Sequence, residues 1–186
     1  MPLPDAVALF RPAGIRWWVS GGHALELHLG HSWRTHEDID IGFMRQDAAA
    51  VRDLLAGWEI HLAAGGVLTP WNGEPLSAVS NHNNLWCRRS ANSPWSLDLT
   101  ISEGDESCWI YRRDPTMRVR WADAVLTDHR AIPYLAPELQ LLFKAKKHRA
   151  KDDLDAATVV PLLDPRRTEF LSSTLPDDHP WHAFLK

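Results

Sequence analysis

The feature that most constrains this chain is an acidic, apolar run that follows a glycine turn. Val19-Ser20-Gly21-Gly22 ends one short apolar segment, and Asp38-Ile39-Asp40-Ile41 begins another. Successive side chains of a strand point to opposite faces, so Asp38 and Asp40 are predicted on one face while the isoleucines enter the core. The two carboxylates would lie roughly 7 Å apart and repel by about 2 kcal/mol at an effective dielectric constant of about 20. A divalent cation between them would turn this repulsion into binding.

A second segment supplies a third carboxylate. From Trp95 to Ile101, apolar residues alternate with polar ones, which predicts a strand with one apolar and one polar face. Asp98 is the only carboxylate on the polar face. Three carboxylates that converge can hold one or two Mg²⁺ ions, which prefer hard oxygen ligands. We therefore expect a metal site formed by Asp38, Asp40 and Asp98.

The glycine turn is the expected phosphate site. Glycine tolerates unusual backbone dihedrals and lets a phosphate approach the backbone closely. A helix predicted over residues 23–29 would direct the free amides of its N-terminus to the same point. Ser20, Gly21 and Gly22 are therefore predicted to hold the β- and γ-phosphates of a nucleotide through the hydroxyl group and the backbone amides.

Together these motifs resemble a known family. The run from Gly21 to Asp40, with its Gly-Gly pair, Arg34, His36 and Asp-Ile-Asp, is similar to the aminoglycoside branch of the nucleotidyltransferase superfamily, in particular the 2''-type enzymes. The resemblance implies an α/β (α+β) fold, the polymerase-beta-like mixed sheet flanked by helices, with a C-terminal helical part. It also implies Mg²⁺-dependent transfer of a nucleoside monophosphate, AMP from ATP or its equivalent from another nucleoside triphosphate, to a hydroxyl of an aminoglycoside-type antibiotic. Pyrophosphate would be released, and the activity would confer antibiotic resistance.

The same resemblance implies roles for individual residues. Asp38 and Asp40 would be metal ligands, and Asp98 would be a third ligand or the catalytic base. Those two roles of Asp98 conflict, because a bound cation stabilises the ionised carboxylate and weakens it as a base. Arg34 would either contact phosphate or substrate, or brace the carboxylates through a bidentate pair. His36 is expected to be structural.

Basic residues in the C-terminal part are further candidates. Lys144, Lys147 and Lys151 recur at intervals of three and four, which places them on one face of a predicted helix. The segment from Arg149 to Asp155 is similar to an Arg-x-Lys-Asp-x2-Asp segment of related nucleotidyltransferases, which implies that Lys144 and Lys151 reach over the triphosphate. A charged, solvated helix is the alternative.

The acceptor is expected to be small, polyhydroxylated and cationic. Acidic residues of the C-terminal part and of the loop over residues 103–106 would attract its ammonium groups. The alternatives are a lincosamide acceptor, a protein or tRNA acceptor as in antitoxin-like nucleotidyltransferases, and a non-enzymatic binding module. The last predicts that one of the three carboxylates is missing, yet all three are present.

Composition excludes some other classes. The net charge of −4 lacks the basic surplus of a DNA or RNA binder. No stretch approaches the roughly 18 apolar residues of a membrane span, and no signal-peptide pattern is present. Two cysteines without a CxxC pair fit a reducing compartment, so we expect a cytoplasmic protein. Four histidines between residues 23 and 36 suggest zinc only weakly, since no cysteine lies nearby and His23 and His28 do not share a helical face.

Ten tryptophans are unusual for a chain of 186 residues. Most are expected in the core or at half-buried sheet positions, because large aromatic side chains dominate core packing. One or two are expected to line a pocket and to stack on a base or on the face of a sugar.

Two parts are predicted along the chain: a nucleotidyltransferase α/β part over residues 1–132 and a helical part over residues 133–186 packed on it. Helices are predicted over residues 5–13, 23–29, 47–56, 152–160 and 165–175, and another begins at Pro137. Strands are predicted over residues 15–20, 38–44, 58–63, 85–88, 95–101, 108–112 and 117–121. No flexible linker separates the two parts.

Overall fold

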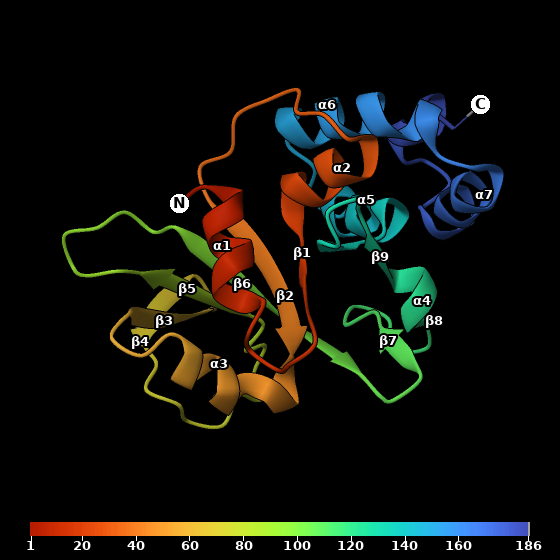
Figure 1. The fold of residues 1–186 in the computed structure, drawn as a ribbon. Helices are drawn as coiled ribbons and strands as arrows, with labels where there is room; N and C mark the ends of the chain where they lie inside the picture. The colour runs from red at the N-terminus through yellow and green to blue at the C-terminus, as the bar shows by residue number, and fades with distance from the viewer. Residues whose placement is uncertain (186) are drawn as a thin grey trace.

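The structure is a computed structural model that describes residues 1–185. Over these residues a mixed sheet has the strand order β4-β3-β5-β6-β2-β1-β10-β9, and β7 and β8 continue from β6 (Figure 1). The pairs β2–β6 and β1–β10 are parallel, and the other pairs are antiparallel. The strands are β1 (Trp17–Val19), β2 (Ile39–Met44), β3 (Glu59–Ala64), β4 (Val67–Pro70), β5 (Asn84–Arg88), β6 (Leu97–Gly104), β7 (Cys108–Ile110), β8 (Arg118–Arg120), β9 (Val125–Thr127) and β10 (Pro133–Leu135).

The helices form two groups. α1 (Leu3–Phe10) and α3 (Ala48–Leu54) pack on one face of the sheet, and α2, α5, α6 and α7 gather at one end of it (Figure 1). The remaining α-helices are α2 (Gly21–Leu29), α4 (Trp121–Ala124), α5 (Pro137–Ala145), α6 (Ala150–Val159) and α7 (Pro165–Thr174). Short 3₁₀ helices cover Arg45–Asp47, Val160–Leu162 and Pro180–Ala183.

The two faces of the central strands differ as the sequence predicts. Alternate residues of β2 and β6 are at most 2% exposed and form the core beneath α1 and α3: Ile39, Ile41, Phe43, Leu97, Leu99 and Ile101. The residues between them, Asp40 and Asp98 included, point to the opposite face. The mixed sheet and this alternation confirm the predicted fold class. Asp38 itself lies just before β2 and is exposed.

Two features of the C-terminal region differ from the sequence expectations. The predicted single helical face with Lys144, Lys147 and Lys151 is wrong, because α5 ends at Ala145 and α6 begins at Ala150. The segment Pro133–Leu135 adds strand β10 to the sheet, in parallel with β1, before α5 begins. Three-residue strands carry too little periodicity to be seen in the sequence, and the division at residue 132 stays a prediction.

The helical part has its own core. It joins residues of α5, α6 and α7 to Trp18, Leu25 and Trp109 of the α/β part. Glu138, which the sequence places only at a helix N-terminus, is 7% exposed and pairs with Arg167 of α7 at 2.5 Å. This ion pair links α5 to α7.

A buried ion cluster, the Arg34 clamp, joins α6 to the loop before β2. Arg34 donates from Nε and Nη2 to the two oxygens of Asp155, at 2.7 and 2.9 Å. Lys144 of α5 lies 3.0 Å from Asp155 and 2.8 Å from Asp152. Because the Asp155 side chain is 0% exposed, its charge depends on Arg34 and Lys144 for compensation.

Two further properties were expected from the sequence. Among the described residues, Cys87 and Cys108 are free, and Cys87 is buried. None of the helices in residues 1–185 combines the length and the apolar character that crossing a membrane requires.

Arg34→Ala should lower the free energy of unfolding by about 3 kcal/mol, because removing one partner of a buried ion pair leaves a poorly compensated charge. Urea unfolding followed by circular dichroism measures it. The control is Arg120→Ala, whose pair with Asp123 is exposed and should change stability by about 0.5 kcal/mol or less. If the two substitutions lowered the free energy of unfolding equally, the Arg34 clamp would not be a stabilising buried ion cluster.

Candidate active site

Two carboxylates on neighbouring parallel strands form the centre of the site. Asp40 of β2 and Asp98 of β6 occupy the same register position, so their side chains leave the same face of the sheet beside each other. Asp38 lies close enough for its charge to act on both. The three carboxylates that the sequence singles out are therefore neighbours in the fold.

The local environment changes the acidity of this group. Burial, the charge of Asp98 and the charge of Asp38 raise the pKa of Asp40 to about 7. Burial is also the main cause that raises the pKa of Asp98 to about 6, although the amide of Asn84 donates to Asp98 at 2.7 Å and opposes the rise. Among the described residues, none of the ion pairs within 4.0 Å includes Asp38, Asp40 or Asp98. The site thus concentrates negative charge without a direct cationic partner.

This donor set fits Mg²⁺. Carboxylate oxygens are the ligands that the ion prefers, and it keeps positions for water and for substrate phosphates. Asp40 and Asp98 have pKa values that are raised by burial and by neighbouring carboxylates, so a dication that binds them would stabilise their ionised forms. Asp38, Asp40 and Asp98 are the residues that would hold the ion.

Gly21 must be a glycine for a reason that involves Asp40. Its φ is +66°, which side chains other than hydrogen rarely adopt. A Cβ atom at this position would overlap the Asp40 carboxylate. The glycine turn and the acidic strand are thus one packed unit, since the turn leaves the space that the carboxylate occupies.

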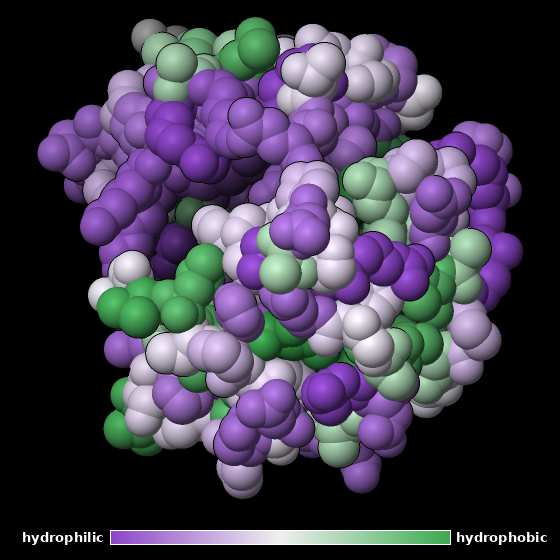
Figure 2. Space-filling model, turned by 90° about the vertical axis from the view of Figure 1, so that its left-hand side faces the viewer, coloured by the Kyte–Doolittle hydropathy of each residue, from purple (hydrophilic) through white to green (hydrophobic). Residues whose placement is uncertain are grey.

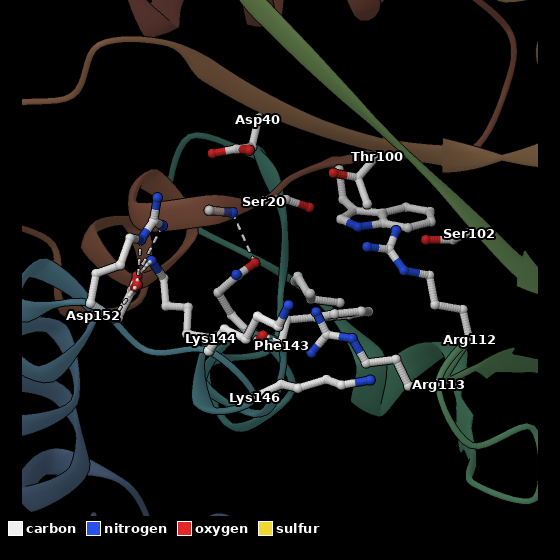
Figure 3. Close-up of a pocket in the computed structure, with 16 residues that line it drawn as sticks. Ser20, Asp40, Thr100, Ser102, Arg112, Arg113, Phe143, Lys144, Lys146 and Asp152 are labelled. Carbon is white, nitrogen blue, oxygen red and sulfur yellow. Dashed lines mark hydrogen bonds and ion pairs between the residues drawn. The ribbon is translucent and has the colours of Figure 1, made fainter. Parts of the chain in front are cut away.

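A pocket of about 550 Å³ lies beside Asp40, between the sheet and the helical part. Figure 3 shows Asp40 and Ser20 on one side of it and Arg112, Arg113 and Lys146 on the other. Six cationic side chains line it: Arg112, Arg113, Lys144, Lys146, Lys147 and Arg149. From the side that Figure 2 shows, the surface is hollowed beneath a wall of hydrophilic residues. A pocket so rich in cations suits a polyanion such as a triphosphate.

Arg112 is the pocket residue that sequence analysis missed. Burial, and next the charge of Arg113, lower the pKa of its guanidinium. Its Nη1 atom is buried and has no hydrogen-bond partner. A buried donor without a partner is costly unless a ligand supplies one. Arg112 lies two residues beyond the short strand β7, at the end of the strand that the sequence predicts over residues 108–112, and no sequence motif marks its charge.

In the predicted phosphate site, two of the backbone amides already donate to groups of the protein itself. The Ser20 amide donates to the Asp40 carbonyl at 2.8 Å, and the Gly21 amide donates to Gln140 Oε1 at 2.8 Å. Gly22 does not line the pocket, because Arg34 and His36 cover its Cα. Ser20 and Gly21 do line it, so this end stays a predicted phosphate site, with Gln140 as the group that a phosphate would displace from Gly21.

The basic candidates fall into different places. Arg34 is bound to Asp155 and does not line the pocket, so the structure places it neither at the pocket nor against the metal-site carboxylates, the two roles that the sequence left open. Lys144 lines the pocket while paired with Asp152 and Asp155. Lys151 is exposed on α6 outside the pocket lining. Its charge still lowers the pKa of Asp40 slightly.

The histidines also fall differently from expectation. The loop brings His36 to His23 and Glu26, and one ligand atom from each lies within 4.8 Å of the others, whereas the sequence analysis considered only His23 and His28, which do not share a helical face. Arg34 Nη1 lies 3.1 Å from His36 Nδ1. Because arginine only donates, Nδ1 is the acceptor in this contact, and Nε2 lies 2.9 Å from Glu26. His36 thus extends the Arg34 clamp to α2, as its expected structural role requires.

Several of the acidic groups expected to attract a cationic acceptor are already paired. Asp152, Asp155 and Asp164 form ion pairs within the helical part and with Arg34. Glu103 pairs with Arg45 at 2.5 Å, and Asp105 pairs with Arg118. Glu103 lies five residues along β6 from Asp98, which is about 17 Å at the rise of a strand. The expectation that this loop faces the site is not supported.

Comparison with known proteins agrees with the geometry. The family model described as aminoglycoside-2''-adenylyltransferase matches residues 3–65, the part that contains the glycine turn, the Arg34 loop and the Asp-Ile-Asp strand. No match is found among curated proteins.

Solved structures extend the likeness to most of the chain. ANT(2'')-Ia in complex with adenylyl-2''-tobramycin is similar with a TM-score of 0.60 at 12% identity, over 98% of this chain and 94% of that one. The solution structure of the antibiotic-resistance factor ANT(2'')-Ia gives 0.59 at 13% identity, over 92% and 87%. The lincomycin-bound lincosamide antibiotic adenylyltransferase LnuA gives 0.57 at 21% identity, over 82% and 90%. The predicted nucleotidyltransferase fold and the predicted resemblance are confirmed.

In the metal-free protein, the contribution of Asp40 and Asp98 to stability should fall as the pH rises from about 4 to about 7. The folded state holds the protons of Asp40 and Asp98 more tightly than the unfolded chain does, so stability present below the unfolded pKa is lost as the pH passes the folded values. Thermal denaturation in EDTA at stepped pH measures this. Asp40→Asn should flatten the dependence and the exposed control Asp177→Asn should not. A pH dependence of the melting temperature that is the same in Asp40→Asn and in the wild type would contradict the assignment.

Proposed function

We propose that this chain, which has the nucleotidyltransferase fold, transfers AMP from ATP to a hydroxyl group of a small aminoglycoside-type molecule and releases pyrophosphate, with Mg²⁺ as its metal ion. The observation that carries the proposal is the register pair of Asp40 and Asp98 beside Gly21, next to a pocket lined by six cations. A carboxylate pair for a dication and a cationic pocket for a triphosphate are the two parts that nucleotidyl transfer requires.

Each side chain of the site has a task in this reaction. The acceptor oxygen forms a bond to the α-phosphorus, the bond from that phosphorus to the bridging oxygen breaks, and pyrophosphate leaves. Asp98, with a pKa near 6, accepts the hydroxyl proton. With Asp98 serving as the base, Mg²⁺ would be held by Asp38 and Asp40 and would neutralise charge on the phosphates. Most of the rate acceleration then comes from positioning and electrostatics.

The cationic pocket supports a triphosphate as the donor. Arg112 and Arg113 approach from the end of β7, and Lys144 and Lys146 approach from α5 and the turn after it. Arg112 offers a buried donor without a partner, which a phosphate oxygen would satisfy. A cytoplasmic location, where ATP and Mg²⁺ are both abundant, is part of the proposal.

A lincosamide is the second candidate acceptor. LnuA, the lincosamide antibiotic adenylyltransferase, shares 21% identity with this chain, against 12% for ANT(2'')-Ia in complex with adenylyl-2''-tobramycin. The paired state of the acidic residues around the site also weakens the case for a strongly polycationic acceptor. A panel of acceptors distinguishes the two classes.

Pyrophosphate release with Mg²⁺-ATP should depend on an acceptor from a panel of aminoglycosides, lincosamides and tRNA. Asp40→Asn should lower kcat by about a thousandfold or more, since a lost carboxylate removes several kcal/mol of transition-state stabilisation. Asp177→Asn, exposed and distant in sequence, is the control. An unchanged kcat in Asp40→Asn would overturn the mechanism. Turnover with tRNA and with no other acceptor of the panel would overturn the proposed acceptor class.

Arg112→Met should raise the KM for ATP by about 10- to 100-fold, because a charge-assisted hydrogen bond to phosphate contributes about 1.5–3 kcal/mol. The variant should fold as stably as the wild type, since the arginine it removes is buried with an unpaired donor. Arg118→Ala, whose side chain is 47% exposed and pairs with Asp105, is the control. The KM for ATP of both variants is measured by steady-state kinetics at saturating acceptor. An unchanged KM for ATP would remove Arg112 from the nucleotide site.

A further inference from the structure

A row of side chains crosses the open face of the sheet at one register level. Asp40 of β2 lies opposite Asp98 of β6, Asp98 lies opposite Trp86 of β5, and Trp86 lies opposite His61 of β3. Residues directly opposite each other point to the same face. The two carboxylates are therefore continued, on the side away from β1, by two aromatic side chains.

The geometry of the transfer fixes which end of this row meets the acceptor. The attacking and leaving oxygens are roughly in line through the α-phosphorus. The cationic pocket that suits the leaving pyrophosphate is lined by residues of β1, β2, β6 and the C-terminal half, and none of its lining comes from β3 or β5. The attacking hydroxyl must therefore approach Asp98 from the Trp86 side.

Trp86 is exposed where tryptophan is usually covered. It is 36% exposed although β5 is an interior strand. Six other tryptophans are at most 9% exposed: Trp17, Trp18, Trp58, Trp71, Trp109 and Trp181. The ring of half-buried Trp95 meets Trp86 edge-on at 6.1 Å, and the His61 ring lies 5.1 Å from Trp95. We call these three residues, Trp86, Trp95 and His61, the aromatic shelf.

The charges around the aromatic shelf are already balanced. The Arg88 guanidinium lies 4.4 Å from the Trp95 ring centroid and pairs with Glu59 at 2.8 Å. The loop with Glu103 and Asp105 lies at the far end of β6 and is paired with arginines. Recognition on this side of Asp98 therefore rests on aromatic faces. A sugar ring matches them, because one of its faces is made of C–H groups while its hydroxyls project from the rim.

We propose that the acceptor is a glycoside that binds on the aromatic shelf, with a sugar ring stacked on Trp86 and the hydroxyl to be modified beside Asp98. This inference rests on the proposed function, because the direction of approach comes from the transfer reaction. It adds the chemistry of recognition: stacking of a sugar face, with ammonium groups in a secondary role.

Steady-state kinetics with tobramycin or lincomycin as acceptor tests the shelf. Trp86→Ala should raise the KM for the acceptor at least tenfold and leave the KM for ATP within about twofold. Trp86→Phe should restore most of the acceptor affinity, since it keeps an aromatic face. Leu162→Ala, which removes a side chain that is 60% exposed, is the control for an exposed apolar truncation. A Trp86→Ala effect on the KM for ATP alone, or an effect that Trp86→Phe does not reverse, would overturn the proposal.

A binding measurement separates this inference from the proposed function. Isothermal titration of tobramycin or lincomycin into the protein without nucleotide should give heat that Trp86→Ala abolishes and Trp86→Phe keeps. If neither compound is turned over but this pattern of binding holds, the transfer reaction is wrong and the shelf stands. If one is turned over and Trp86→Ala leaves its KM unchanged, the transfer reaction stands and the shelf is wrong. If neither compound binds and neither is turned over, both the transfer reaction and the shelf are wrong. Turnover of tRNA alone would overturn the proposal of a glycoside acceptor.

Discussion

The register between β2 and β6 places two carboxylates side by side on one face of a sheet, and the rest of the site is arranged around that unfavourable pair. Burial and the charge of neighbouring carboxylates raise both pKa values, that of Asp40 to about 7 and that of Asp98 to about 6. The opposite faces of the same strands carry isoleucines and leucines of the core that are at most 2% exposed. A slip of one residue would therefore expose the core and bury the acids together. Hydrophobic burial thus holds the carboxylates in a position that their own charges oppose.

Around this pair the molecule separates its charges by position. The helical part and the end of β7 place six cations on the pocket side of Asp40, although the whole chain carries a net charge of −4. The Arg34 clamp and its extension through His36 fix the helical part to the loop that precedes β2. The stability of the fold and the placement of the cations beside the acids therefore depend on the same buried contacts.

The two ends of the site use different chemistry. Cations dominate the end near Gly21 and α5, whereas aromatic rings continue the row beyond Asp98. An in-line displacement needs two such ends, because the leaving group carries the negative charge of pyrophosphate and the attacking group is a neutral hydroxyl. The expected acidic acceptor loop lies about 17 Å away along β6, paired with arginines.

The sequence by itself determined the features that local patterns encode. Alternation placed Asp40 and Asp98 opposite the core, and the glycine pair marked the turn beside them, so the carboxylates followed from periodicity and the fold class from the family resemblance of these motifs. Only the tertiary structure decided which charges are free. Arg34 looked like a ligand and proved to be bound to Asp155, the lysines were divided between two helices, and Arg112 and Trp86 became visible through burial and exposure. Pairing between residues far apart in the chain leaves no periodic trace, because it depends on where the helical part packs.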